Sequence, residues 1–131
     1  MTPYKLRDWI NINKIDWEKL SPNPNAIHLL EQNPDKINWE SLNTNPNAIH
    51  LIEQKLDKID WWLLSDNPNA IDLLEQNQDK ISWYWLSHNT KAIKLLEQSL
   101  DNLDWEQLSG NLSAIPLLEK NPDKIVWSYF I

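Results

Sequence analysis

Apolar residues recur along this chain at a fixed interval. Six tryptophans are spaced by 22 residues without a slip, at Trp17, Trp39, Trp61, Trp83, Trp105 and Trp127. An isoleucine or leucine stands two residues before each of them, and an asparagine and an Ala-Ile block follow in the first five cases. Such self-similarity is the signature of a tandem-repeat protein. The sequence predicts a leader or cap at residues 1–14, followed at residues 15–131 by five full repeats and a truncated sixth.

Each repeat has room for two short helices. In the second half, apolar residues lie at helical spacing (26, 27, 29 and 30), and Asn23 before Pro24 predicts an N-cap and the first helical position. This pattern predicts a second helix of about nine residues. In the first half, a capping residue directly precedes each tryptophan, at Asp16, Asn38, Asp60, Ser82 and Asp104. Such short helices are marginal alone, so the repeats must stack. We therefore expect an all-α fold, an α-solenoid of short helix pairs.

A leucine-rich-repeat fold is the alternative. Its period is also 20 to 29 residues, and Ile-x-Trp-x-x-Leu-x-x-Asn faintly matches its strand consensus. Against it, each Asn-Pro step removes an N–H that a strand ladder would use, and capping residues stand where that consensus needs leucine. The helical solenoid is favoured.

The repeat also resembles sequences in a known group of proteins. The string LSPNPNAIHLLEQNPDKINW, at residues 20–39, is similar to the tandem repeats of uncharacterised proteins in giant DNA viruses with large genomes. The resemblance covers about residues 15 to 127. It implies a viral protein made in the cytoplasm of a eukaryotic host, and it implies no activity and no catalytic residue.

Composition and charge exclude several classes of function. The chain has nine tryptophans, one glycine and no cysteine. Without cysteine it has no disulfide framework and no thiol chemistry. A net charge of -7 without a basic face argues against binding to nucleic acid or to an anionic membrane surface. The start of the chain lacks the apolar run of a signal peptide, and no stretch approaches the roughly 18 apolar residues of a membrane span. We expect a cytoplasmic protein.

No catalytic or cofactor site is expected. The lone Gly110 cannot make a phosphate-binding loop, and the serine that ends most of the first helices is typical of a turn. His28 and His50 occupy equivalent positions, which Asp72 and Lys94 continue with mixed charge, so we expect no metal site beyond adventitious binding. We predict that the protein is not an enzyme.

One recurring residue and one exceptional residue lead to specific expectations about the second helix. Glutamate recurs near its C-terminus, where the helix dipole disfavours it, and we expect each carboxylate to accept from an indole or backbone N–H, or to lie in solvent beside a lysine. These glutamates are Glu31, Glu53, Glu75, Glu97 and Glu119. Pro116 falls in the second helix of the fifth repeat and is expected to disturb that helix.

The two positions after each tryptophan differ most between repeats. They are charged or polar in the first two repeats but read Trp62-Leu63 and Tyr84-Trp85 in the third and fourth. If these positions face solvent, the four apolar side chains form an exposed recognition patch. The alternative is that they thicken the core between the first helices.

These patterns predict a non-catalytic repeat scaffold that binds a protein partner. The predicted contact residues are Trp62, Leu63, Tyr84 and Trp85, with the row of His28, His50, Asp72 and Lys94 as a second surface. The alternative is a structural protein that self-assembles through its terminal repeats, because the leader (Tyr4, Leu6, Trp9, Ile10 and Ile12) and the ending at residues 127–131 are both rich in apolar residues. Glycan binding by the exposed aromatic rings is a third, weaker interpretation.

Overall fold

The computed structural model describes residues 8–130, and these are helical with no strand. The all-α prediction is therefore confirmed, and the leucine-rich alternative is wrong. The α-helices are α1 (Trp17–Leu20), α2 (Ile27–Gln32), α3 (Trp39–Leu42), α4 (Ile49–Ile52), α5 (Trp61–Leu64), α6 (Ile71–Glu75), α7 (Trp83–His88), α8 (Ile93–Glu97), α9 (Trp105–Ser109) and α10 (Ile115–Lys120). None of them is long and apolar enough to cross a bilayer.

Short 3-10 turns complete the repeat. They are η1 (Ile12–Lys14), η2 (Pro34–Lys36), η3 (Leu56–Lys58), η4 (Gln78–Lys80), η5 (Leu100–Asn102), η6 (Leu112–Ala114) and η7 (Pro122–Lys124). All of them except η6 precede the Ile-x-Trp or Leu-x-Trp segment that begins the next repeat. The chain divides into two compact units, one ending at Asp60 and the other beginning at Trp61.

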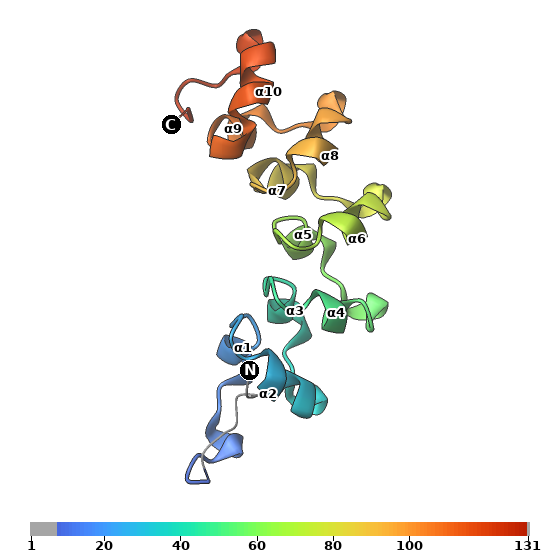
Figure 1. Cartoon of the computed structure of the whole chain (residues 1–131), viewed down its shortest axis with the longest axis vertical. Coiled ribbons are helices and arrows are strands. Elements are labelled where there is room, and N and C mark those ends of the chain that lie inside the picture. Colours follow the sequence, from blue (N-terminus) through green and yellow to red (C-terminus); the bar gives the residue numbers. More distant parts are fainter. Residues whose placement is uncertain (1–7, 131) are drawn as a thin grey trace. The chain divides into compact units, whose positions relative to one another are not determined.

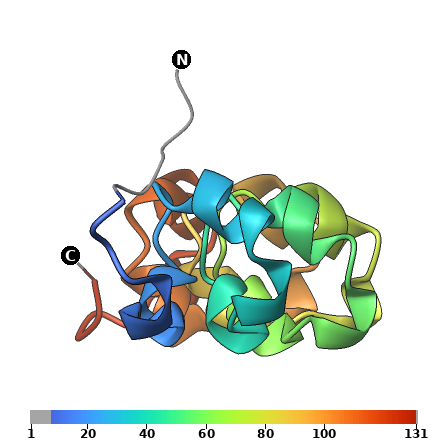
Figure 2. The same ribbon diagram turned by 90° about the horizontal axis from the view of Figure 1, so that it is seen from below.

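Within each unit the two helices of a repeat lie in separate layers. In the second unit, the first helices α5, α7 and α9 follow one another, and the second helices α6, α8 and α10 run beside them (Figures 1 and 2). In the first unit, α1 and α3 are likewise separated from α2 and α4 (Figure 1). Equivalent positions of consecutive repeats therefore become neighbours within a unit.

The first helices begin as the capping residues predict. The carboxylate of Asp16 accepts from the backbone N–H of Lys19, and that of Asp104 accepts from the N–H of Gln107. The side chain of Asn38 accepts from Ser41 in the same way. Ser82 occupies the same position before α7 without a capping hydrogen bond of its side chain. Capping supplies acceptors for N–H groups that a four- to six-residue helix leaves unpaired.

The second helices are shorter than predicted because Asn-Pro is a turn and not their N-cap. The helix α2 begins at Ile27, with Ala26 in the capping position. Asn23 instead closes a turn: its side-chain oxygen accepts from the N–H of Asn25, and its backbone oxygen accepts from the N–H of Ala26. Asparagine favours such turns because its side chain mimics a backbone acceptor.

Asparagine also ends several second helices. The side-chain amide of Asn33 donates to the carbonyl oxygen of Leu29 at 2.9 Å, and Asn77 and Asn121 make the equivalent bonds. The backbone of Asn33 has φ of -133°, which lies outside the left-handed region. Pro116 lies in the first turn of α10, where it disturbs nothing, and α10 keeps six residues.

The core is built from leucines and alanines of both layers. The leucine three residues after each tryptophan is fully buried at Leu42, Leu64, Leu86 and Leu108. The alanine before each second helix and the Leu-Leu or Leu-Ile pair inside it are also buried. The recurring tryptophans Trp17, Trp39, Trp61, Trp83 and Trp105 are half-buried, and Trp127 is exposed. Aliphatic side chains thus fill the interior, and the indoles cover it.

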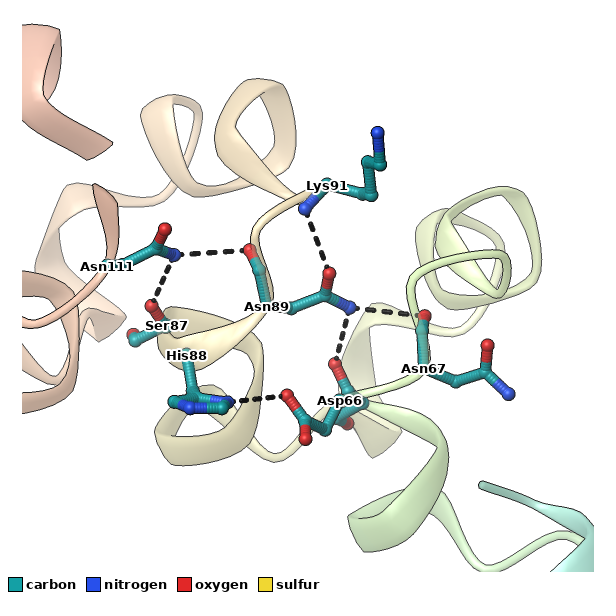
Figure 3. Close-up of polar contacts among 8 residues, drawn as sticks. Asp66, Asn67, Ser87, His88, Asn89, Lys91 and Asn111 are labelled. Atoms are coloured by element: carbon teal, nitrogen blue, oxygen red, sulfur yellow. Dashed lines mark hydrogen bonds and ion pairs between the residues drawn. The ribbon is translucent and has the colours of Figure 1, made fainter. Parts of the chain in front are cut away.

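A row of buried asparagines joins consecutive repeats. The side-chain amide of Asn89 donates to the carbonyl oxygens of Ser65 (3.0 Å) and Asn67 (3.1 Å), and its oxygen accepts from the N–H of Lys91 (Figure 3). Asn111 donates in the same way to Ser87 and Asn89. In the first unit, Asn45 repeats the pattern. It donates to the carbonyl oxygens of Ser21 and Asn23, both at 2.9 Å. We call these asparagines the asparagine ladder.

A buried serine makes a second connection. The hydroxyl of Ser65 donates to the carbonyl oxygen of Trp61 at 2.6 Å and accepts from the N–H of Ser82, 17 residues later. Ser109 connects Trp105 to Val126 in the same manner. The serine predicted to mark a turn therefore also fixes the start of the next repeat.

The recurring glutamates do not accept from indole or backbone N–H groups, so that expectation is wrong. All five side chains lie on the surface. Glu31 is paired with His50, whose Nε2 lies 2.7 Å from its Oε1. The cost of a carboxylate near a helix C-terminus is small when solvent screens it.

Candidate functional site

Four apolar side chains on the first helices of the second unit form the most distinctive part of its surface. Trp62 and Leu63 lie in α5, and Tyr84 and Trp85 lie in α7, directly after the tryptophan that begins each helix. We call Trp62, Leu63, Tyr84 and Trp85 the aromatic patch. Their position follows from the repeat, because the next residue in each helix is the fully buried Leu64 or Leu86.

The four residues are not equally accessible. Trp62 is 57% exposed and Tyr84 is 42% exposed. Leu63 and Trp85 are half-buried. Each of the two alternatives considered for the sequence therefore describes part of the patch: Trp62 and Tyr84 present their rings to solvent, whereas Leu63 and Trp85 extend the packing beneath them.

The rings pack edge-on around Trp85. Its ring centroid lies 5.1 Å from that of Tyr84 and 6.4 Å from that of Trp62, with interplanar angles of 87° and 70°. The ring of His88 is the third neighbour, at 6.1 Å and 89°. Edge-to-face arrangements at these distances are favourable for aromatic pairs. The rings of Trp62, Tyr84, Trp85 and His88 therefore form one contiguous cluster of edge-on contacts.

One polar atom in the cluster lacks a partner. The indole Nε1 of Trp85 is buried and has no hydrogen-bond acceptor. A buried donor without an acceptor costs about 1 to 3 kcal/mol, and most buried polar groups in proteins are satisfied. The N–H of Trp85 is an exception to this rule.

A histidine and carboxylate pair lies at the edge of the patch. Nδ1 of His88 is 2.8 Å from Oδ1 of Asp66 (Figure 3). The two residues occupy equivalent positions of consecutive repeats. The pair was not predicted from the sequence. A histidine and an aspartate at equivalent positions 22 residues apart are nevertheless a usable signal for contact between stacked repeats.

The surroundings of the patch are acidic. The helix α7 packs against α9, where the exposed Glu106 occupies the position equivalent to Trp62 and Tyr84. Residues 61–130 include ten aspartates and glutamates against five lysines and no arginine. Asp66 is paired with His88, so the exposed Glu106 and the acidic excess of the whole unit are what favour a cationic partner over an anionic one.

The second predicted surface is divided between the units. His28 and His50 lie in the first unit, and Asp72 and Lys94 lie in the second. His28 is half-buried and the other three are exposed. The two histidines have separate partners: His28 Nε2 lies 2.9 Å from the side-chain amide of Gln32, and His50 pairs with Glu31. Among residues 8–130, no group of three or more potential metal ligands is present.

Apolar side chains are also exposed in the truncated sixth repeat. Trp127, Tyr129 and Phe130 are 67%, 50% and 37% exposed, and the rings of Trp127 and Phe130 lie 5.3 Å apart. Of the apolar leader residues, Trp9 is 79% exposed and Ile10 is half-buried, whereas Tyr4 and Leu6 lie outside the described residues. Self-assembly through the terminal repeats stays a prediction.

The chain was also compared with known proteins. No protein-family model, no curated protein and no solved structure matches it.

Proposed function

We propose that the protein is a non-catalytic repeat scaffold that binds a protein partner through the aromatic patch. The observation that carries this proposal is the exposure of Trp62 and Tyr84 at a position where other repeats carry Glu18, Glu40 or Glu106. Large aromatic side chains exposed together are typical anchors of protein interfaces.

The fold does not require aromatic rings at these two positions. Three other repeats place glutamate there, and the sixth places Ser128. The buried leucines and alanines already fill the interior. A role in recognition explains why two consecutive repeats carry rings that the same backbone does without elsewhere.

The proposal extends to the setting of the protein. The resemblance of its repeat to those of giant DNA viruses supports a viral protein that acts in the cytoplasm of the host cell. Nothing in the described chemistry of the patch requires a cofactor, a nucleic acid or a membrane.

Replacing both exposed rings tests the proposal. The double variant W62S/Y84S removes both exposed rings and introduces the small polar residue that Ser128 supplies at the equivalent position of the sixth repeat. We expect the free energy of unfolding to change by about 1 kcal/mol or less, as for most surface substitutions. Ligands selected on the wild-type protein from a displayed library of random peptides should bind the variant about 30-fold more weakly, equivalent to the roughly 2 kcal/mol of a binding anchor.

A matched control separates the patch from the rest of the surface. The variant H50S/K94S changes two exposed residues of the second predicted surface. It should bind the selected peptides as the wild type does. Peptides that bind W62S/Y84S as tightly as the wild type, or a selection that yields none, would contradict the proposal. If W62S/Y84S does not fold, the two rings belong to the core and the proposal is wrong.

A further inference from the structure

The charge and the hydrogen-bonding state of the aromatic patch indicate what it binds. We propose that the patch docks an extended, arginine-containing peptide segment of the partner, with an arginine side chain on the exposed rings and a peptide carbonyl oxygen on Nε1 of Trp85. This inference rests on the proposed function and names the chemical class of its partner.

The exposed rings suit a cation. Tryptophan and tyrosine attract a guanidinium placed over the ring face, and arginine additionally stacks on such rings. The second unit already holds one cation in this way, because Nζ of Lys80 lies 5.1 Å from the centroid of the Trp61 ring. Trp62 and Tyr84 are 57% and 42% exposed, so both residues present surface that a cation from another molecule can contact.

Charge selects the same class of partner. Asp66 lies at one edge of the patch, and Glu106 lies on the neighbouring helix α9. The unit has an excess of acidic residues, and the whole chain carries a net charge of -7. Complementary potentials speed encounter and discriminate against partners of the wrong charge. An acidic segment would be repelled from this surface.

The unpaired indole N–H of Trp85 favours a partner segment with an extended backbone. An extended or polyproline-type segment has carbonyl oxygens without internal partners, whereas a helix uses its own. Trp85 lies among the rings of Trp62, Tyr84 and His88. Trp62 packs edge-on against Trp85 and is itself more than half exposed, so in the proposed complex the docking segment displaces the Trp62 side chain to reach the buried indole N–H. A carbonyl oxygen placed there satisfies the buried donor.

A titration with defined peptides tests this inference. The probe is a fluorescein-labelled seven-residue peptide of alternating glycine and arginine, with matched peptides that carry lysine or the uncharged isostere citrulline in place of arginine. We expect the arginine peptide to bind at least tenfold more tightly than the citrulline peptide, and more tightly than the lysine peptide. The W62S/Y84S variant should bind the arginine peptide at least tenfold more weakly than the wild type does. Trp85→Phe, which keeps a ring and removes the donor, should weaken binding by about fivefold, the equivalent of one hydrogen bond.

A variant that replaces the rings with carboxylates separates recognition of the peptide by the rings from general electrostatic attraction of a cationic peptide. The variant W62E/Y84E borrows the glutamates of positions 18 and 40 and adds two negative charges. It should bind the arginine peptide more weakly than the wild type because the rings are lost. Tighter binding by this variant, or equal binding of the arginine and citrulline peptides, would overturn the inference. If the arginine peptide does not bind, while the library peptides bind the wild type more tightly than W62S/Y84S, this inference is overturned and the proposed function stands.

Discussion

Asn89→Ala is expected to lower the free energy of unfolding by about 3 kcal/mol. The change removes the donors to the carbonyl oxygens of Ser65 and Asn67 and the acceptor of the Lys91 N–H. Asn89 is only 2% exposed, so water does not replace these partners, and each net hydrogen bond contributes about 1 kcal/mol. Urea denaturation followed by circular dichroism measures the loss.

Asn23→Ala is the matched control. Asn23 stands at the same position of the first repeat and closes the same turn, through its bond from Asn25. It is exposed, and no bond from its side-chain amide to a carbonyl is present among the described residues. We expect a loss of about 1 kcal/mol or less. Equal losses for the two variants would show that the turn, and not the connection between repeats, is what the asparagine stabilises.

Leu86→Ala is expected to lower the free energy of unfolding by about 3 to 4 kcal/mol, within the range of roughly 2 to 5 kcal/mol for a buried leucine that leaves a cavity. Leu86 is fully buried in α7, directly after Trp85. Leu112→Ala is the control, because Leu112 is 65% exposed and should cost about 0.5 kcal/mol or less. Thermal and urea unfolding of both variants measure the difference. A small loss at Leu86 would mean that the indoles, and not the aliphatic layer, form the core.

The periodic apolar positions were sufficient to predict the helical repeat, because each repeat must bury the same residues to fold. They were insufficient to predict where the second helices begin. At Asn23 the sequence is compatible with a helix N-cap or with a turn, and both place the side-chain oxygen on a nearby backbone N–H. The choice depends on hydrogen bonds that Asn45, Asn89 and Asn111 each donate to the preceding repeat. Their acceptors lie 22 to 24 residues earlier in the chain.

A signal for the ladder is nevertheless present in the sequence. The proline after this asparagine is replaced by Thr90 and Leu112 in two repeats, whereas the asparagine itself is kept in all five. A residue needed only for the turn would be expected to vary with the proline. The persistence of the asparagine indicates a side-chain role beyond its own repeat.

The aromatic patch could be predicted in part. Glutamates at equivalent positions correctly indicated that Trp62 and Tyr84 reach solvent. The partial burial of Trp85 could not be read from its neighbours in the chain, because it depends on ring contacts between α5 and α7. The unpaired state of its indole N–H is likewise a property of packing and not of spacing.

Hydrogen exchange of the asparagine side-chain amides, measured by NMR, tests the central claim that the repeats are joined by the buried ladder. The account predicts slow exchange for the Nδ2 protons of Asn45, Asn89 and Asn111, since each amide donates to two carbonyl oxygens and is at most 2% exposed. The exposed Asn23 should exchange at the rate of an unstructured peptide. Exchange of all four amides at that fast rate would contradict the ladder and the stacking that it supports.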